Sequence, residues 1–463
     1  MLEEGGPPGR GRNAMEKNLT TGSVFRNIVG FSLPYLLAYF LQTLYGMADL
    51  FITGQFSGTA DITAVSIGSQ VMHMITVMIV GLAMGTTIAI GRAVGGREQE
   101  KAALAIGNSA TLFIGLSVVL TALLLALVRP IVAVMSTPAE AVEGTVRYLT
   151  ICFIGIPFIT AYNIISSIFR GLGDSQSPMK FVAVACAANI LLDYLFIGGM
   201  HLGPAGAALG TTLSQTLSVV VSLVMVTRQK SALPVTRASF RPRKDVLGSI
   251  LKVGVPVALQ DGFIQISFLL ITVIANGRGL DDAAAVGIVE KVISFVFLVP
   301  SSMLSTVSAL AAQNIGAGRY DRAAQTLRYA VGMCLCFGLV VGTIVQFAAG
   351  GIVSVFDSTP AVVTAGSQYI RGYIWDCMFA GAHFSCSGYF CAYGRSGVSF
   401  LHNALSIVLV RIPGAYLMSR LFPSTLLPMG CAATAGSLLS VIVCVIALVW
   451  LRRRGALDHP VQV

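Results

Sequence analysis

IGNSATLFIGLSVVLTALLLALV, residues 106–128, carries no charged side chain from one end to the other. A run of about 18 or more apolar residues is long enough to cross the hydrocarbon core of a bilayer as one helix. Similar runs occupy residues 331–347 and, with small residues before it, 213–226. The sequence therefore predicts a protein whose helices cross a membrane repeatedly.

The overall composition supports this prediction. Of the 463 residues, 55% are hydrophobic and only 11% are charged, which is too little charge to cover the surface of a soluble protein of this length. The net charge of +10 does not indicate nucleic-acid binding, because the basic residues lie in short segments between the apolar runs. The nine cysteines lie almost entirely inside those runs and lack metal-site spacing, so we interpret them as packing residues. No signal peptide is expected from the polar start, where Met15 is an alternative first residue.

The apolar segments number twelve and form two sets of six. The first set covers residues 26–53, 62–90, 104–128, 146–170, 178–199 and 205–227, and the second covers 247–275, 284–312, 325–349, 367–393, 397–420 and 427–451. Basic residues gather between the sets, from Arg228 to Lys252, where Asp245 alone is acidic. The expected organisation is a tail (1–25), a six-helix bundle (26–227), a basic linker (228–246), a second six-helix bundle (247–451) and a second tail (452–463).

The charges of the connecting loops predict the orientation. Basic residues dominate the loops on the side of the two termini, for example Arg97, Lys101, Arg319 and Arg322, whereas acidic residues dominate the opposite loops. Cytoplasmic loops carry the excess of Lys and Arg. We therefore expect a multi-pass protein of the plasma membrane (the bacterial inner membrane) with both termini in the cytoplasm.

The two halves resemble each other at an offset of about 222 residues. The Pro34 segment matches the Pro256 segment, and Gly171-Leu172-Gly173-Asp174-Ser175 is echoed by Tyr393-Gly394-Arg395-Ser396. Gly95-Gly96-Arg97 likewise matches Gly316-Ala317-Gly318-Arg319. These turns lack the Lys-Ser/Thr of a phosphate-binding loop, so we interpret them as helix ends at which glycine supplies the left-handed residue. The predicted fold is an all-α integral membrane protein, in which twelve transmembrane helices form two pseudo-symmetric bundles around a central cavity, and this fold is typical of secondary transporters.

Several of these stretches also carry a resemblance to a known family. They are Leu19-Thr20-Thr21-Gly22-Ser23, Gln42-Thr43-Leu44-Tyr45-Gly46-Met47-Ala48-Asp49, Phe169-Arg170-Gly171-Leu172-Gly173-Asp174, Asn189-Ile190-Leu191-Leu192-Asp193, Gln313-Asn314-Ile315-Gly316-Ala317-Gly318 and Val410-Arg411-Ile412-Pro413. In their order and spacing, the chain resembles the MATE (multidrug and toxic compound extrusion) transporters from Leu19 to Arg454, and most closely the DinF-like bacterial branch. The resemblance implies export of organic cations and related amphiphiles, driven by inward flow of protons or sodium ions.

Charged residues inside the spans are the first candidates for function, because each costs about 2.5–3.5 kcal/mol on insertion scales. In the first span, Gln42, Tyr45 and Asp49 share one helical face, and Pro34 gives the helix a place to bend. In the fifth span, Asn189 and Asp193 are i, i+4 neighbours. By the resemblance to the DinF-like branch, Asp49, Asp193, Asn189, Thr211 and Tyr148 form a cation-coupling site. The alternative is that these polar groups only hold neighbouring helices together.

The second bundle offers a less defined set of candidates. They are Asp261, Gln265, Glu290, Lys291, Asp376, His383 and Arg411. Asp261, Glu290 and Asp376 could form a second carboxylate site for substrate or ion, or an ion-pair network with Lys291 and Arg411 that is purely structural. Asp376 and His383 share one face of the tenth span.

The functional prediction is a proton- or sodium-coupled antiporter that exports amphiphilic, cationic compounds, works as a monomer in the lipid bilayer, and needs neither a cofactor nor a nucleic acid. It is not an enzyme. One alternative is a flippase for lipid-linked sugars, which the predominance of acidic over basic residues inside the spans disfavours. The other is a sensor or scaffold, for which the tails are too short. The sequence leaves open the transported compound, the coupling ion, the oligomeric state and the role of the acids in the second bundle.

Overall fold

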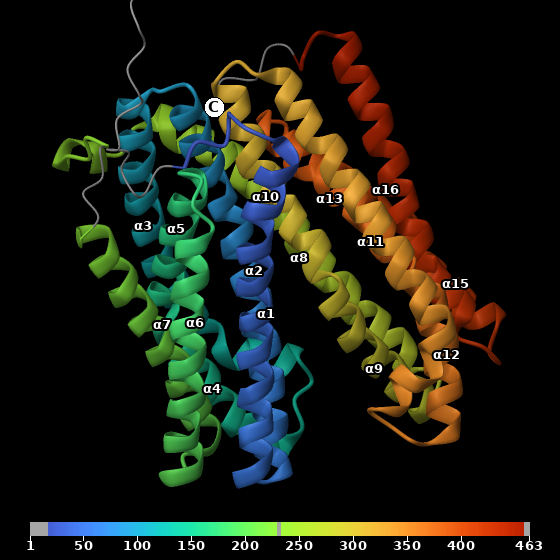
Figure 1. The fold of residues 1–463 in the computed structure, drawn as a ribbon. Helices are drawn as coiled ribbons and strands as arrows, with labels where there is room; N and C mark the ends of the chain where they lie inside the picture. The colour runs from blue at the N-terminus through green and yellow to red at the C-terminus, as the bar shows by residue number, and fades with distance from the viewer. Residues whose placement is uncertain (1–16, 229–232, 458–463) are drawn as a thin grey trace, which may run out of the picture.

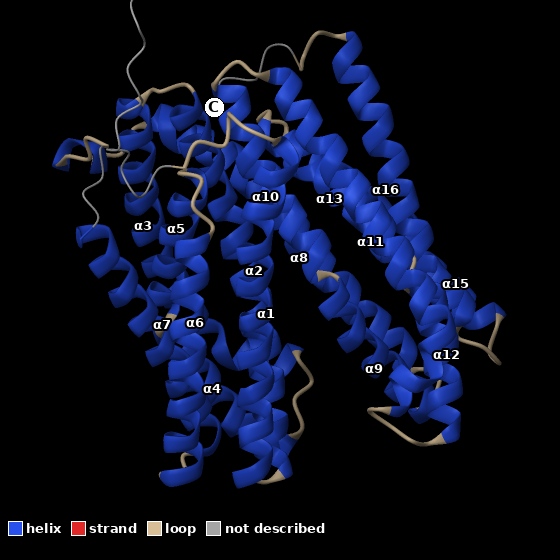
Figure 2. Ribbon diagram, in the orientation of Figure 1, coloured by secondary structure: helices blue, strands red, loops and turns tan. Residues whose placement is uncertain are grey.

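The computed structural model describes residues 17–228 and 233–457, and within these ranges it is built of helices and connecting turns, with no strand (Figure 2). The first half contains α1 (Val24–Phe56), α2 (Thr59–Gly95), α3 (Gln99–Val134), α4 (Val142–Ile154), α5 (Ile156–Gly171), α6 (Gln176–Asp193) and α7 (Gly203–Arg228). Short helical segments, η1 (Ala139–Ala141) and the π-helical η2 (Tyr194–Gly199), precede α4 and follow α6.

The second half repeats this order after a short helical turn in the linker, η3 (Arg237–Phe240). Its helices are α8 (Lys244–Asn276), α9 (Leu280–Val296), α10 (Leu298–Gly316), α11 (Tyr320–Ser354), α12 (Pro360–Tyr373), α13 (Asp376–Ala392), α14 (Ser396–Ser406), the π-helical η4 (Ile407–Arg411), α15 (Ile412–Leu421) and α16 (Leu427–Arg453). Most of the predicted tail 1–25 and the final residues of the tail 452–463 fall outside the described residues. The predicted domain bounds therefore stay a prediction.

The helices form two groups, one from each half of the chain (Figure 1). The groups meet at the end of the molecule where the described chain begins and ends, here called the terminal end, and diverge toward the opposite end. Contact between the halves runs through α2 with α8 and α10, and through α1 with α10. The predicted all-helical fold of two bundles is confirmed.

Eleven of the expected spans are long and apolar enough to cross a membrane, if α4 and α5, which meet at a bend of 50°, count as one span. The tenth span, made of α12 and α13, is the exception among the described residues. Each of its two helices is shorter than a full crossing, with 14 and 17 residues, and Ile374 and Trp375 separate them. Both bundles therefore have a broken helix at the corresponding place of the repeat.

Glycines allow α2 and α8 to touch backbone to backbone between the bundles. A Cβ atom at Gly85 would overlap the carbonyl oxygen of Ile250, and one at Gly254 would overlap that of Leu82. Such close approach of helices at small residues is typical of membrane proteins. We call this contact the α2–α8 seam.

At the terminal end, the repeat produces a pair of matching contacts between the bundles. Arg92 donates through Nε to the carbonyl oxygen of Ala392 over 2.9 Å, and Gln313 donates to that of Gly171 over 3.1 Å. In each case a side chain at the end of one helix binds the last turn of a helix in the other bundle. The contact satisfies carbonyl groups that a helix end leaves without partners.

The glycine turns differ from the sequence interpretation at one of the two places. Gly318 has the expected left-handed conformation, with φ of 68°, but in the first turn Arg97 adopts it, with φ of 59°. Gly95 has another role, because a Cβ there would overlap the backbone of Gln313. The need for close packing between the bundles therefore explains this glycine, and the turn itself does not.

The residues before α1 tie the two bundles together. The backbone N–H of Lys17 donates to Leu172 in the first bundle over 3.0 Å, and that of Leu19 donates to the Gln313 side chain in the second over 3.1 Å. Arg319 and Arg322 of the second bundle donate to carbonyl groups of the same segment. Residues 17–22 thus fasten the terminal end in the closed arrangement.

Candidate functional site

The carboxyl groups predicted for the first bundle lie next to each other in the structure. Asp49 of α1 and Asp193 at the end of α6 are both buried, with 2% and 0% of their surface exposed, and their carboxyl groups are within interaction distance. The hydroxyl of Thr211 in α7 donates to Asp49 Oδ2 over 3.1 Å. Asn189, one turn before Asp193, is fully buried beside them. Four residues that sequence reasoning grouped together therefore form one site.

Most of the polar atoms in this site have no hydrogen-bond partner within the described part of the chain. These are Asp49 Oδ1, both carboxyl oxygens of Asp193, and both polar atoms of the Asn189 amide. Buried polar groups in proteins are almost always satisfied, so an orphaned group calls for a proton, an ion or a water. The donor set of carboxylate, amide and hydroxyl oxygens suits a hard cation such as sodium.

Local structure makes room for this cluster. A Cβ at Gly210 of α7 would overlap Asp193 Oδ1, so glycine is the residue that lets the Asp193 carboxyl reach its position. The π-helical turn η2 begins directly after Asp193. A π-helical turn inside a membrane helix is often found at a functional site.

Gly210→Ala gives a sharp test of this geometry. The new methyl group would overlap only the Asp193 side chain, while the nearest backbone atom stays at an ordinary contact distance of 3.6 Å, so we expect the protein to fold normally and Asp193 to move away from Asp49. Any ion-driven transport should then fall by about tenfold or more, as for a misplaced reacting group. The matched control is Gly46→Ala on α1, which has open space around it and should transport normally. Equal transport by both variants would contradict the requirement for close approach.

The other candidates of the first bundle lie near the site without touching the carboxyl groups. Tyr148 hydrogen-bonds Ser69 over 3.1 Å, and its ring occupies space left by Gly68. The Tyr45 hydroxyl accepts from Gln215 over 3.4 Å. Gln215 was missed by sequence reasoning, although its place one turn after Thr211 in α7 puts it on the same face.

Gln42 and Pro34 stand apart from the carboxyl pair. Gln42 is half-buried and has no hydrogen bond with another described residue, while Pro34 lies inside a continuous α1. Because proline removes a backbone hydrogen bond, it weakens α1 between the terminal end and Asp49. This part of α1 is where a bend would be absorbed.

The candidates of the second bundle separate into two places. Arg411 forms an ion pair with Asp376, with 3.5 Å between Nη2 and Oδ2, and donates to the Tyr373 hydroxyl over 2.5 Å. Glu290 is close enough to Arg411 to interact electrostatically, and its Oε2 lies 3.5 Å from the Thr272 hydroxyl. The structure thus brings Glu290, Asp376 and Arg411 together.

Asp261 does not belong to this group. Its carboxyl packs against Gly81 of α2, at the contact between the bundles, and Gln265 lies one turn further along α8. Lys291 is exposed and forms no ion pair within the described residues, and it acts on Glu290 only electrostatically. Sequence spacing could not separate these residues, because it does not say how the helices are rotated against each other.

His383 is buried in α13 and stacks edge-on against His402 of α14, with 5.4 Å between ring centroids. His402 in turn shares a hydrogen bond of 2.9 Å with Ser387. His402 was not identified from the sequence, because its span, unlike that of His383, contains no acidic residue beside which a histidine would be noticed. Among the described residues, no group of three or more His, Cys, Asp or Glu side chains could hold a metal ion.

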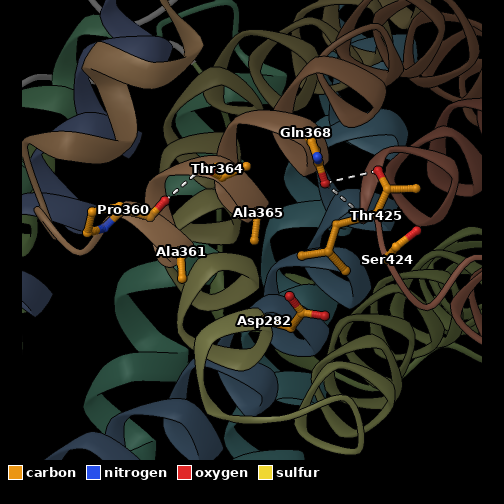
Figure 3. Close-up of a pocket in the computed structure, with 9 residues that line it drawn as sticks. Asp282, Pro360, Ala361, Thr364, Ala365, Gln368, Ser424 and Thr425 are labelled. Atoms are coloured by element: carbon orange, nitrogen blue, oxygen red, sulfur yellow. Dashed lines mark hydrogen bonds between the residues drawn. The ribbon is translucent and has the colours of Figure 1, made fainter.

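A cavity lies at the end of the second bundle that is remote from the terminal end (Figure 3). It measures about 390 Å³ and lies between the start of α9, α12 and the turn before α16. Gln368 closes one wall by accepting hydrogen bonds from the Thr425 hydroxyl and the Leu426 N–H. Its one charged side chain, Asp282, is paired with Arg278, so the cavity has no ionised group free for a ligand.

Comparison with known sequences identifies relatives along most of the chain. The model of the MatE family matches residues 34–195 and 256–417, one match in each bundle. The chain is 29% identical to the "probable multidrug resistance protein YpnP" of Bacillus subtilis over 87% of its length and 90% of that protein. It is 23% identical to the "multidrug export protein MepA" of Staphylococcus haemolyticus over 87% of its length and 89% of that protein.

Solved structures show the same fold. The chain superimposes on the "crystal structure of MATE in complex with MaL6" with a TM-score of 0.87 and 22% identity, over 95% of this chain and 98% of that one. It superimposes on the "outward-facing conformation of a multidrug resistance MATE family transporter of the MOP superfamily" with a TM-score of 0.86 and 22% identity, over the same shares.

Proposed function

Because the chain belongs to the MatE family of membrane transporters, which the matches in both of its bundles show, we propose that it is an antiporter that exports amphiphilic, cationic drugs or metabolites in exchange for protons or sodium ions. The relatives named as multidrug resistance or export proteins support this substrate class. The proposed place is the plasma membrane of a bacterium, with both termini in the cytoplasm.

The observation that carries the proposal is the buried pair of carboxyl groups, Asp49 and Asp193. Two such groups side by side cannot both stay ionised without a positive charge, so the pair binds a proton or a sodium ion. The oxygen atoms of Asn189 and Thr211 lie beside the pair and would complete the surroundings of a bound proton or sodium ion. Binding changes the net charge inside the first bundle by one unit.

Coupling needs a cation that binds one conformation better than the other. Asp49 lies on α1, which contains Pro34 and touches α10 of the second bundle. A cation at Asp49 would therefore favour one conformation of α1. That conformation would determine whether the bundles diverge at the end opposite the terminal end. The inward flow of the cation then drives export of the substrate, if the substrate binds best to the conformation of the protein that holds no cation.

Asp49→Asn and Asp193→Asn test the proposal directly. Each variant keeps the size of the side chain and removes one of the two charges, so gradient-driven export should fall by about tenfold or more. The measurement is uptake or release of an organic cation by proteoliposomes, with proton and sodium gradients imposed separately. The ion whose gradient drives the wild-type protein is then the coupling ion.

Thr53→Val serves as the matched control. Its hydroxyl binds the backbone of Asp49 over 2.7 Å and does not reach the carboxyl pair, so this variant should transport normally. Wild-type rates and gradient dependence in Asp49→Asn would exclude the carboxyl pair as the coupling site.

A further inference from the structure

The second bundle contains a buried polar cluster of the same charge type as the site in the first. Glu290 and Asp376 supply two carboxyl groups, as Asp49 and Asp193 do in the first bundle. The difference is that a guanidinium group, that of Arg411, forms an ion pair with Asp376 and is close enough to Glu290 to interact with it electrostatically. Two carboxylates and one cation leave the same net charge as the first site has after it binds an ion.

Arg411 is held by contacts that suit a cation and leave it little freedom. Its guanidinium lies over the ring of Phe268 at 5.1 Å and over that of Tyr373 at 5.6 Å, and it donates to the Tyr373 hydroxyl. Aromatic faces attract cations, and more strongly so away from water. The side chain is 8% exposed, and Asp376 beside it is fully buried.

The space beside Arg411 is small. A small cavity beside Arg411, bounded also by His383, Asn403 and Ser437, measures about 20 Å³. A cavity needs about 10–15 Å³ to hold one water, so a single water fits and a hydrated sodium ion does not. Neither oxygen of Asp376 and only one oxygen of Glu290 has a hydrogen-bond partner in the described part of the chain. The guanidinium is therefore the ion-pair partner of Asp376, and it acts on Glu290 electrostatically.

The repeat relates one residue of each cluster, whereas the acids of the two clusters do not correspond. At the offset of about 222 residues, Arg411 of the eleventh span corresponds to Asn189 of the fifth. Arg411 is the last residue of the π-helical turn η4, and Asn189 lies one turn before Asp193, after which the π-helical turn η2 begins. The amide of the first site is thus replaced by a side chain that carries its own positive charge.

We propose that Arg411 is a tethered cation, whose guanidinium permanently fills the cation site of the second bundle. The second bundle then exchanges no ion during transport, and all coupling passes through the first bundle. Arg411 is accordingly a positioning residue, because it holds Glu290 and Asp376 together and fixes α12, α13 and α15 around them. Removing the guanidinium should convert the cluster into an open site that binds a proton or sodium.

Trp375 offers a direct reporter for the test. It precedes Asp376 at the break between α12 and α13, and the chain contains one other tryptophan, Trp450. A Trp450→Phe background therefore isolates the fluorescence of Trp375. In this parent, in detergent, we expect no saturable change of Trp375 emission as sodium replaces choline or as the pH is lowered. Arg411→Gln, which introduces an amide like that of Asn189, should gain a saturable change.

Further variants keep the outcome clear. Adding Asp376→Asn to Arg411→Gln should remove the gained response and restore stability if Arg411→Gln alone unfolds. Arg411→Lys keeps a positive charge on this side chain, so its Trp375 emission should show no saturable change with sodium or pH. A saturable response of the parent that Asp376→Asn abolishes would overturn the proposal, because the bundle would then hold an exchangeable ion. So would a folded Arg411→Gln protein without any response.

The inference rests on the proposed function only for its comparison with the first site. Each titration is repeated with Asp49→Asn, so that movement caused by an ion at the first site cannot be mistaken for binding at the second. Normal export by Asp49→Asn would reject the proposed function and leave the Trp375 result to be judged by itself.

Discussion

Gly85→Val is expected to abolish transport while leaving both bundles folded. The new side chain would overlap the carbonyl oxygen of Ile250, a backbone atom that cannot move unless α8 moves as a whole. Each bundle keeps its own core, but the α2–α8 seam cannot close. The protein should then be held with its terminal end open, and the alternation of access that export requires should stop.

Spin labels at Glu100 and Asp321 measure this effect. Both residues are exposed and lie near the terminal end, one in each bundle. We expect a shift of the label-to-label distance to larger values in Gly85→Val, together with loss of export. Gly248→Val, on α8 but with open space around the glycine, is the matched control and should resemble the wild type. An unchanged distance in Gly85→Val would show that the seam tolerates a side chain.

Arg278→Ala is expected to cause the largest loss of stability. Arg278 forms an ion pair of 2.7 Å with Asp282, and its Nη atoms donate to the carbonyl oxygens of Ser419, Phe422 and Pro423. The side chains of the pair are only 8% and 24% exposed. Removing one partner of such a network leaves buried groups unsatisfied and costs about 3–5 kcal/mol. For a unit of roughly 200 residues, this lowers the melting temperature by about 6–20 °C.

Arg129→Ala provides the comparison, because Arg129 pairs with Glu143 on the surface, where both side chains are more than half exposed, at 67% and 63%. An exposed ion pair contributes about 0–1 kcal/mol, so this variant should unfold close to the wild-type temperature. Thermal unfolding in detergent, followed by circular dichroism, measures both. Equal melting temperatures for the two variants would show that the Arg278 network does not hold the outer end of the second bundle.

The sequence was sufficient to predict the helices, and the closeness of Asn189 to Asp193, for physical reasons. A span must satisfy its backbone internally and bury its surface in lipid, so its apolar length alone identifies it. Asn189 and Asp193 could be paired because their spacing within one helix fixes their relative direction. Asp49 and Thr211 joined them through the resemblance, which adds what spacing within one helix cannot give, namely which helices are neighbours.

The second bundle shows where such reasoning fails. Asp261 and Glu290 are both acids in adjacent spans, yet one faces the first bundle and the other faces Arg411. Which face of a helix points inward depends on packing with several neighbours, and apolar residues cover almost every face of these spans. A helix that is hydrophobic all round gives no periodic signal from which its rotation can be predicted.

The break between α12 and α13 has a consequence for biosynthesis. Among the spans of the described residues, this segment alone does not have the length and apolar composition to cross a membrane, and it carries Asp376 at its centre. A segment with an ionised residue at its midpoint partitions poorly from the insertion machinery into the bilayer. We therefore expect the tenth span to leave the translocon only when its neighbours α11 and α16, which pack against it, are available. Arg411, made later in the chain, would neutralise Asp376 at that moment, so assembly of the second bundle is completed from its C-terminal end.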